Sequence, residues 1–170
     1  VFTVRNVFLS DLLNLLKYEF RQVQINKIDV GILPENQLRT IARINAIQLP
    51  TDRILFDRIR NLFYFDLYTQ YYDEIEHQYS DRDFLKLVWD KKIRGKNNRI
   101  GYLRESLFES FIEDRIKANA FFLPATKYIN EEFDTLISEE IIADDPDLGL
   151  FITHDIFEEW GLYRIIDKKW

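Results

Sequence analysis

Apolar residues that recur every three or four positions dominate the sequence from Pro34 onward, and this spacing constrains the fold more than any other feature. It places the apolar side chains on one face of successive amphipathic helices. Between Pro34 and Pro50 we expect one helix whose buried face holds four residues, namely Leu38, Ile41, Ala42 and Ile44. The sequence therefore predicts a mainly α fold.

The first 31 residues have a different pattern, which is that of a short α/β segment. Residues 1–4 form a β-branched apolar run typical of a buried strand, and Arg5 follows this run directly. Residues 11–20 have the apolar spacing of a helix, and residues 23–28 are an extended apolar segment before Gly31. We therefore expect strand, helix and strand here, as the remnant of an α/β domain.

The middle of the chain predicts a run of aromatic-rich helices. Asn61 begins one of them, and Ser80 opens another with the spacing of a capping box. This second helix ends at Gly95, and residues 95–98 form the clearest hinge or loop of the sequence. The basic residues 91–96 are interpreted as a solvated helix end, which the helix dipole favours.

The C-terminal part has the element order of a winged helix, which is helix, strand, helix and β-hairpin. A turn that contains Pro146 and Gly149 separates the two apolar runs of the hairpin. The elements are a helix over residues 100–119, a short strand over 121–123, a helix capped by Asn130, a hairpin over 141–152 and a last helix over 155–167. The residues expected to be buried are Leu103, Leu107, Phe108, Phe111 and Ile116 on the long helix and Ile156, Trp160 and Tyr163 on the last one.

The charge of the predicted winged helix opposes DNA binding. Winged helices often place their second main helix in the major groove, where Arg and Lys reach phosphates and base edges. Residues 130–140 contain no Lys or Arg, and the net charge of the chain is -6. The acidic residues of this helix and of the turn after it are Glu131, Glu132, Asp134, Glu139, Glu140, Asp144, Asp145 and Asp147. We therefore expect a protein partner or self-assembly rather than DNA.

Composition excludes several other classes of protein. The 170 residues include no cysteine, which excludes disulfides, a Cys-ligated zinc site and a cysteine nucleophile. The longest stretch without Asp, Glu, Lys or Arg, residues 118–126, is far shorter than the roughly 20 residues of a membrane-spanning helix. No secretory signal is recognisable, so a cytoplasmic location is expected. Methionine is absent as well, and we expect this sequence to be a piece of a longer chain.

Two residues are candidates for phosphate binding on their positions alone. His154 lies at the start of the last helix, where its imidazole N–H is able to donate to an anion. Glu158 lies four residues on, at an acceptable spacing for a metal site, but two ligands do not fill a coordination shell, and no metal is expected. Arg5 lies at the end of a predicted strand, where it pairs either with a phosphate or with a surface carboxylate.

Three segments, taken together, resemble the STAND class of P-loop NTPases, relatives of the AAA+ proteins that include the NACHT and NB-ARC proteins. Residues 1–5, V-F-T-V-R, resemble the sensor 1 strand and its arginine. Residues 60–65, R-N-L-F-Y-F, are similar to the segment R-N-P-F-Y-L of bacterial members. Residues 153–160, T-H-D-I-F-E-E-W, look like the form that the winged-helix M-H-D motif takes in that class.

The resemblance implies a division of the chain and a role for each matching residue. Residues 1–31 would end a nucleotide-binding α/β domain, 32–95 would form the AAA+ lid-like helical domain, and 96–170 the winged-helix domain. In the family the matching histidine contacts the β-phosphate of ADP, and the sensor 1 arginine reads the terminal phosphate, which implies these roles for His154 and Arg5. Leu62 replaces the proline that seats the adenine, and Asn61 and Phe63 flank this position.

The resemblance also implies a regulatory rather than a hydrolytic role. The Walker A lysine and Walker B carboxylates are not in this sequence, so ADP or ATP with Mg²⁺ would be bound together with the missing P-loop half. The expected function is the nucleotide-sensing part of a bacterial, cytoplasmic STAND ATPase that acts as a signalling or defence switch. The alternative is a winged-helix module that binds a protein and no nucleotide, and a DNA-binding regulator is the third candidate.

Overall fold

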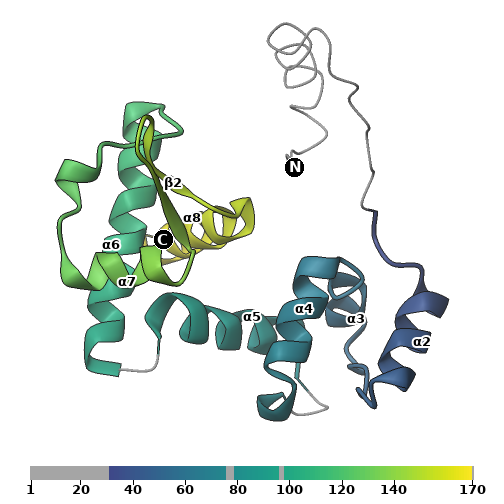
Figure 1. The fold of residues 1–170 in the computed structure, drawn as a ribbon. Coiled ribbons are helices and arrows are strands. Elements are labelled where there is room, and N and C mark those ends of the chain that lie inside the picture. The colour runs from purple at the N-terminus through teal and green to yellow at the C-terminus, as the bar shows by residue number, and fades with distance from the viewer. Residues whose placement is uncertain (1–30, 76–78, 96–97, 170) are drawn as a thin grey trace, which may run out of the picture. The chain divides into compact units, whose positions relative to one another are not determined.

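The computed structural model describes residues 31–75, 79–95 and 98–169. These residues form a mainly helical structure with a small two-stranded antiparallel sheet, as expected (Figure 1). From Leu33 onward the chain is one compact unit. The strand, helix and strand expected in the first 30 residues lie outside the described ones. Within the described ranges, no helix has both the length and the apolar character that crossing a membrane requires.

The helical part, residues 33–95, begins its helices where side-chain caps are available. Asn61 accepts a hydrogen bond from the backbone N–H of Phe63, and Ser80 and Asp83 form a reciprocal capping box. Both predicted helix beginnings are therefore confirmed. The elements of this part are α2 (Glu35–Ile44), α3 (Arg53–Arg58), α4 (Leu62–Gln70), a 3₁₀ turn (Tyr72–Glu74), α5 (Asp81–Trp89) and the π-helical turn η3 (Asp90–Arg94).

The helical part has a core of its own. Leu38 of α2, Leu55 of α3 and Phe84 of α5 are completely buried in it. The expectation that Ile44 lies on the buried face of α2 is wrong, because this side chain is 74% exposed. Ile44 follows Leu38 by six residues, which is a rotation of roughly 240° about the helix axis, and this places it away from the core.

The winged-helix part, residues 98–169, has the predicted element order. Its hairpin pairs Ile142 with Ile152, and an isolated antiparallel bridge between Leu123 and Leu150 adds the expected short strand. Asn130 caps α7 by accepting from two backbone N–H groups. The elements are α6 (Asn98–Ala118), a 3₁₀ turn (Ala125–Lys127), α7 (Glu131–Ser138), β1 (Ile142–Asp145), β2 (Gly149–Ile152) and α8 (Asp155–Lys169).

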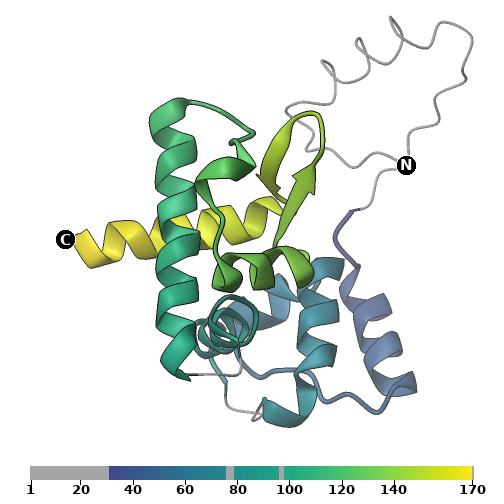
Figure 2. The same cartoon turned by 60° about the vertical axis from the view of Figure 1, so that its left-hand side comes forward.

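The packing of α8 against α6 requires a glycine. Figure 2 shows α8 crossing α6, and the two helices are in contact. At Gly161 of α8 an added Cβ would lie 2.1 Å from Cδ1 of Ile112, which is completely buried. The missing side chain therefore lets the two helices approach closely enough to close the winged-helix core.

The predicted apolar stripes of α6 and α8 are partly wrong. Leu103 and Ile116 of α6 are 46% and 54% exposed, and Tyr163 of α8 is 73% exposed. Along α8 the buried positions are 157, 161 and 165, and residue 163 lies on the opposite side of the helix. The buried face of α6 is displaced from the apolar pattern because it includes three charged residues, Arg104, Glu105 and Arg115.

Candidate functional site

The structure brings together two of the residues predicted to bind nucleotide. The rings of Phe63 on α4 and His154 before α8 are stacked, with centroids 3.9 Å apart and planes inclined by 30°. Asn61 caps α4, and Leu62, the first residue of that helix, is 45% exposed. Arg5 lies outside the described residues.

His154 is held by the end of the hairpin and the start of α8. Its Nδ1 accepts a hydrogen bond from the backbone N–H of Ile156 at 3.4 Å, and its carbonyl accepts from the N–H of Phe157 at 3.0 Å. The hydroxyl of Thr153 donates to the carbonyl of Glu140 at 2.6 Å, which fixes the strand end before it. An imidazole whose Nδ1 accepts a hydrogen bond has Nε2 as its remaining donor, and this tautomer of His154 is assigned from that hydrogen bond. The N-terminal end of α8 therefore carries an N–H donor where the helix dipole favours an anion.

An aromatic joint surrounds this histidine and connects α4 with α8. Phe63 packs edge-on against Tyr64 and Phe157, at centroid distances of 5.7 and 5.9 Å. Trp160 contacts Tyr64 at 5.8 Å and Phe157 at 6.0 Å. We use the name aromatic joint for these four residues and His154. Phe63, predicted to lie near an adenine, here covers one face of the predicted phosphate sensor.

A cleft of about 590 Å³ opens beside the joint, between α4 and the winged-helix part. Phe63, His154 and Phe157 line one side of it, and Lys92 is a basic residue in its wall. Its acidic lining residues are Asp66, Glu139, Glu140 and Asp144. This surplus of carboxylates opposes a polyphosphate inside the cleft. The described residues thus supply His154 and Lys92 as hydrogen-bond donors for a phosphate, and not a complete phosphate site.

Glu158, which was considered together with His154 for a metal site, is bound by an arginine instead. Glu158 lies 3.0 Å from Nη1 of Arg115, which is buried, and this ion pair accounts for its position on α8. Among the described ranges there is no group of three or more His, Cys, Asp or Glu residues able to hold a metal ion. The contact of Glu158 therefore indicates a structural role.

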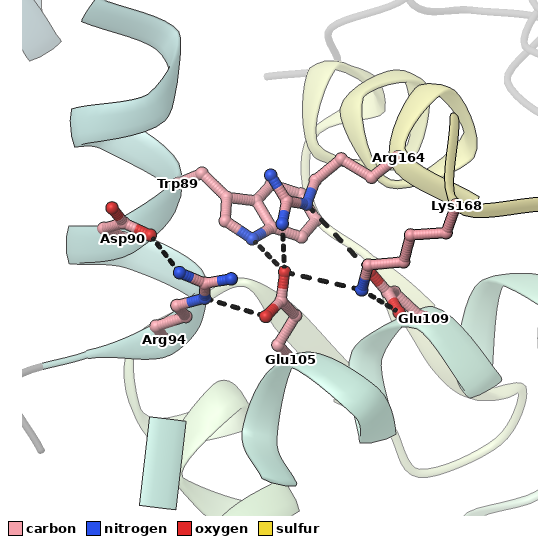
Figure 3. Close-up of polar contacts among 7 residues, drawn as sticks. All are labelled: Trp89, Asp90, Arg94, Glu105, Glu109, Arg164 and Lys168. Carbon is pink, nitrogen blue, oxygen red and sulfur yellow. Dashed lines mark hydrogen bonds and ion pairs between the residues drawn. The ribbon is translucent and has the colours of Figure 1, made fainter. Parts of the chain in front are cut away.

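A second polar site lies where α5 and η3 meet α6 and α8, and it centres on the carboxylate of Glu105 (Figure 3). This side chain is only 3% exposed. It accepts hydrogen bonds from Trp89 Nε1 at 2.9 Å, Arg94 Nε at 2.7 Å and Arg164 Nη2 at 2.6 Å. Burial by itself raises the pKa of Glu105, but the bonds from Arg94 and Trp89 and the charge of Arg164 bring it below its ordinary value of 4.5.

Further pairs complete the group that we call the Glu105 cluster. Arg94 Nη1 also binds Asp90 at 2.9 Å, and Lys168 Nζ binds Glu109 at 2.7 Å. The guanidinium of Arg164 lies 4.8 Å from the ring centroid of Trp89. Three carboxylates thus meet three cations, so the charges of the cluster balance. Its members are Trp89, Asp90, Arg94, Glu105, Glu109, Arg164 and Lys168.

The sequence analysis missed this cluster. The interpretation of residues 91–96 as a solvated helix end is wrong for Arg94, which binds the buried Glu105. Lys91 is partly exposed and pairs with the exposed Glu74 at 2.5 Å. A signal was present, because both long helices carry like charges four residues apart. Those pairs are Glu105 and Glu109 on α6 and Arg164 and Lys168 on α8.

Comparisons of the chain with models of protein families, with curated proteins and with solved structures found no match.

Proposed function

We propose that the chain is the nucleotide-sensing regulatory part of a STAND-type ATPase switch, with His154 as the residue that responds to bound ADP. The supporting observation is the stack of Phe63 on His154. These residues belong to the segments 60–65 and 153–160, which are far apart in the sequence and resemble motifs of one family. Their contact brings the two segments to one place, which a shared nucleotide site needs.

In this proposal His154 is the residue that donates a hydrogen bond to a phosphate of the nucleotide. Nε2–H of His154, at the N-terminal end of α8, suits one phosphate oxygen, whereas the acidic cleft beside it does not suit a chain of phosphates. The remaining charge of ADP and Mg²⁺ would be met by a P-loop half that this sequence lacks. Bound ADP supplies a diphosphate that bridges the two halves, and the described chain contributes a lid that closes on it.

The switch itself would be a shift between two populations. A diphosphate that contacts His154 only in the closed arrangement favours that arrangement, and its loss favours an open arrangement that assembles. We infer that the parent protein is bacterial and cytoplasmic, acts in signalling or defence, and hydrolyses ATP only with the P-loop half. The absence of cysteine fits a reducing compartment.

A protein-binding winged helix without nucleotide is the second candidate. The acidic cleft and the acidic first turn of α7 favour it, because both repel phosphates and suit a basic protein surface. DNA is a poor partner for the same reason.

Titration of ADP into a chain extended upstream through a Walker A lysine tests the proposal. His154→Phe keeps an aromatic ring against Phe63 but removes the N–H donor. We expect the affinity for ADP to fall about tenfold, because a hydrogen bond to a charged group is lost. Tyr163→Phe, on the exposed side of α8, is the matched control and should bind as the parent chain does.

Two outcomes would contradict the proposal. The first is an extended chain that does not bind ADP, which would favour the protein-binding module. The second is an unchanged affinity in His154→Phe together with an unchanged unfolding midpoint, which would leave His154 with a packing role only.

A further inference from the structure

The Glu105 cluster has no part in the nucleotide proposal, yet it joins the same two parts of the molecule. Trp89 and Arg94 come from α5 and η3 of the helical part, and Glu105 and Arg164 from α6 and α8 of the winged-helix part. Figure 3 shows that donors from both parts point to one carboxylate. Trp89 and Arg164 bind one of its oxygens, and Arg94 binds the other.

Burial makes this carboxylate dependent on all of its partners. A charge that is 3% exposed has little water to replace a lost hydrogen bond. Moving α8 away removes Arg164, and moving α5 and η3 away removes Trp89 and Arg94. Either movement leaves a buried charge without part of its compensation, which strongly favours the arrangement observed.

Gly95 and Gly101, on either side of residues 96 and 97, are closely packed against neighbouring residues. Gly95 has φ of 72°, a left-handed value that favours glycine, and an added Cβ would lie 2.9 Å from Nη1 of Arg104. At Gly101 an added Cβ would lie 2.8 Å from the carbonyl oxygen of Arg94. The start of α6 therefore lies directly against η3.

A helical rod, formed by α5 and η3 in succession, also spans the two cores. Phe84 and Val88 of α5 lie in the core of the helical part, whereas Trp89 and Ile93 lie in the core of the winged-helix part. Any rotation between the parts must therefore disturb this rod or the contacts at its C-terminal end, where the Glu105 carboxylate is bound.

We propose that Glu105 is a latch that locks α8 of the winged-helix part to α5 and η3 of the helical part, and that rotation at Gly95 requires its release. The latch does not depend on nucleotide binding. It goes beyond the proposed function by naming the contact that must break before the two parts separate.

Distance measurement between two spin labels tests the latch on this chain. The sequence has no cysteine, so Arg43→Cys on α2 and Lys117→Cys on α6, both at exposed positions, give two unique labels. We expect one narrow distance population in the labelled parent chain. Glu105→Gln should add a second, broader population.

Glu109→Gln is the matched control. Glu109 lies one turn further along α6 and forms ion pairs with Lys168 and Arg164 of α8, within the winged-helix part. This variant should keep the single population. Arg94→Gln removes a helical-part donor and leaves Glu105 in place, and it should broaden the distribution as Glu105→Gln does, which provides the test if Glu105→Gln does not fold.

The proposal is overturned if a folded Glu105→Gln or Arg94→Gln keeps the single narrow population, with circular dichroism confirming native helix content. It is also overturned if Glu109→Gln broadens the distribution equally, because the effect would then belong to charge removal on α6 in general.

Discussion

The aromatic joint and the Glu105 cluster connect the same two parts of the molecule by different physical means. In the joint, rings on α4 and α8 lie 5.7–6.0 Å apart around one close stack of 3.9 Å. In the cluster, one buried carboxylate is bound by three donors at 2.6–2.9 Å. Ring contacts change little when side chains slide, whereas charge-assisted hydrogen bonds require short distances and alignment.

This difference indicates a division of roles. The aromatic joint contributes buried apolar area and holds His154, and it tolerates small shifts of α8. The Glu105 cluster determines which relative position of the parts is stable, because a misplaced partner leaves charge buried without compensation. Substitutions in the aromatic joint and in the Glu105 cluster should therefore differ in how much stability they remove and in how that loss depends on pH.

The largest effect is expected for Glu105→Gln. Three donors then face a neutral amide, and the partly buried Arg94 and Arg164 each lose one of their carboxylate partners. We expect the free energy of unfolding to fall by about 3–5 kcal/mol. Urea unfolding followed by circular dichroism measures it. Glu109→Gln, with a partner exposed to solvent, should lose about 1 kcal/mol or less, and equal losses in the two variants would remove the distinction between them.

Trp89→Phe is expected to have the next largest effect. It keeps an aromatic ring in the core but removes the Nε1–H that binds Glu105. A hydrogen bond to a charged group contributes roughly 1.5–3 kcal/mol, and we expect a loss of about 2 kcal/mol. The same urea unfolding experiment measures the loss. A double variant with Glu105→Gln that loses less stability than the sum of the two single losses would support the pairing, and an additive double variant would argue against it.

A smaller loss is expected for Phe63→Leu, in the aromatic joint. The substitution keeps an apolar side chain and removes the ring contacts with His154, Tyr64 and Phe157, so we expect about 1 kcal/mol. Thermal unfolding by calorimetry measures the change. A loss as large as that of Glu105→Gln would show that the joint, and not the cluster, dominates the connection.

The smallest effect is expected in the pH dependence of the unfolding free energy. This dependence should distinguish the Glu105 cluster from the aromatic joint. The folded-state pKa of Glu105 is lowered, so its stabilising contribution is present above its ordinary pKa of 4.5 and is lost as the pH falls through the folded value. The difference in unfolding free energy between the parent chain and Glu105→Gln should therefore narrow below about pH 4.5. The difference in unfolding free energy between the parent chain and Phe63→Leu serves as the control in the same titration series. A difference for Glu105→Gln that stays constant with pH would contradict the lowered pKa of Glu105.

Much of the fold was predictable because it depends on local patterns. The caps at Asn61, Ser80 and Asn130 and the turn of the hairpin are properties of a few neighbouring residues, and the structure has them all. The resemblance implied only that His154 and Phe63 both lie near one nucleotide, and no local pattern predicted their contact. Its geometry depends on how α4 meets the end of the hairpin.

The Glu105 cluster was not predictable by the same means. Periodicity assigns charged residues to solvent, which shifted the expected stripe of α6 towards Leu103 and Ile116. Burial of Glu105 depends on donors from three other elements, and its partners are known only once α5, η3, α6 and α8 are packed. Tertiary packing overrode the local pattern at this position.

The most direct test of the nucleotide proposal observes the ring nitrogens of His154 in the extended chain, by ¹⁵N NMR with labelled histidine. We predict that Nδ1 of His154 remains an acceptor and that the Nε2 signal shifts when ADP is added, because the proton on Nε2 then binds a phosphate oxygen. His154→Phe identifies the signal by its loss. An Nε2 signal that does not move while ADP binds would contradict the assignment of His154 as the nucleotide sensor.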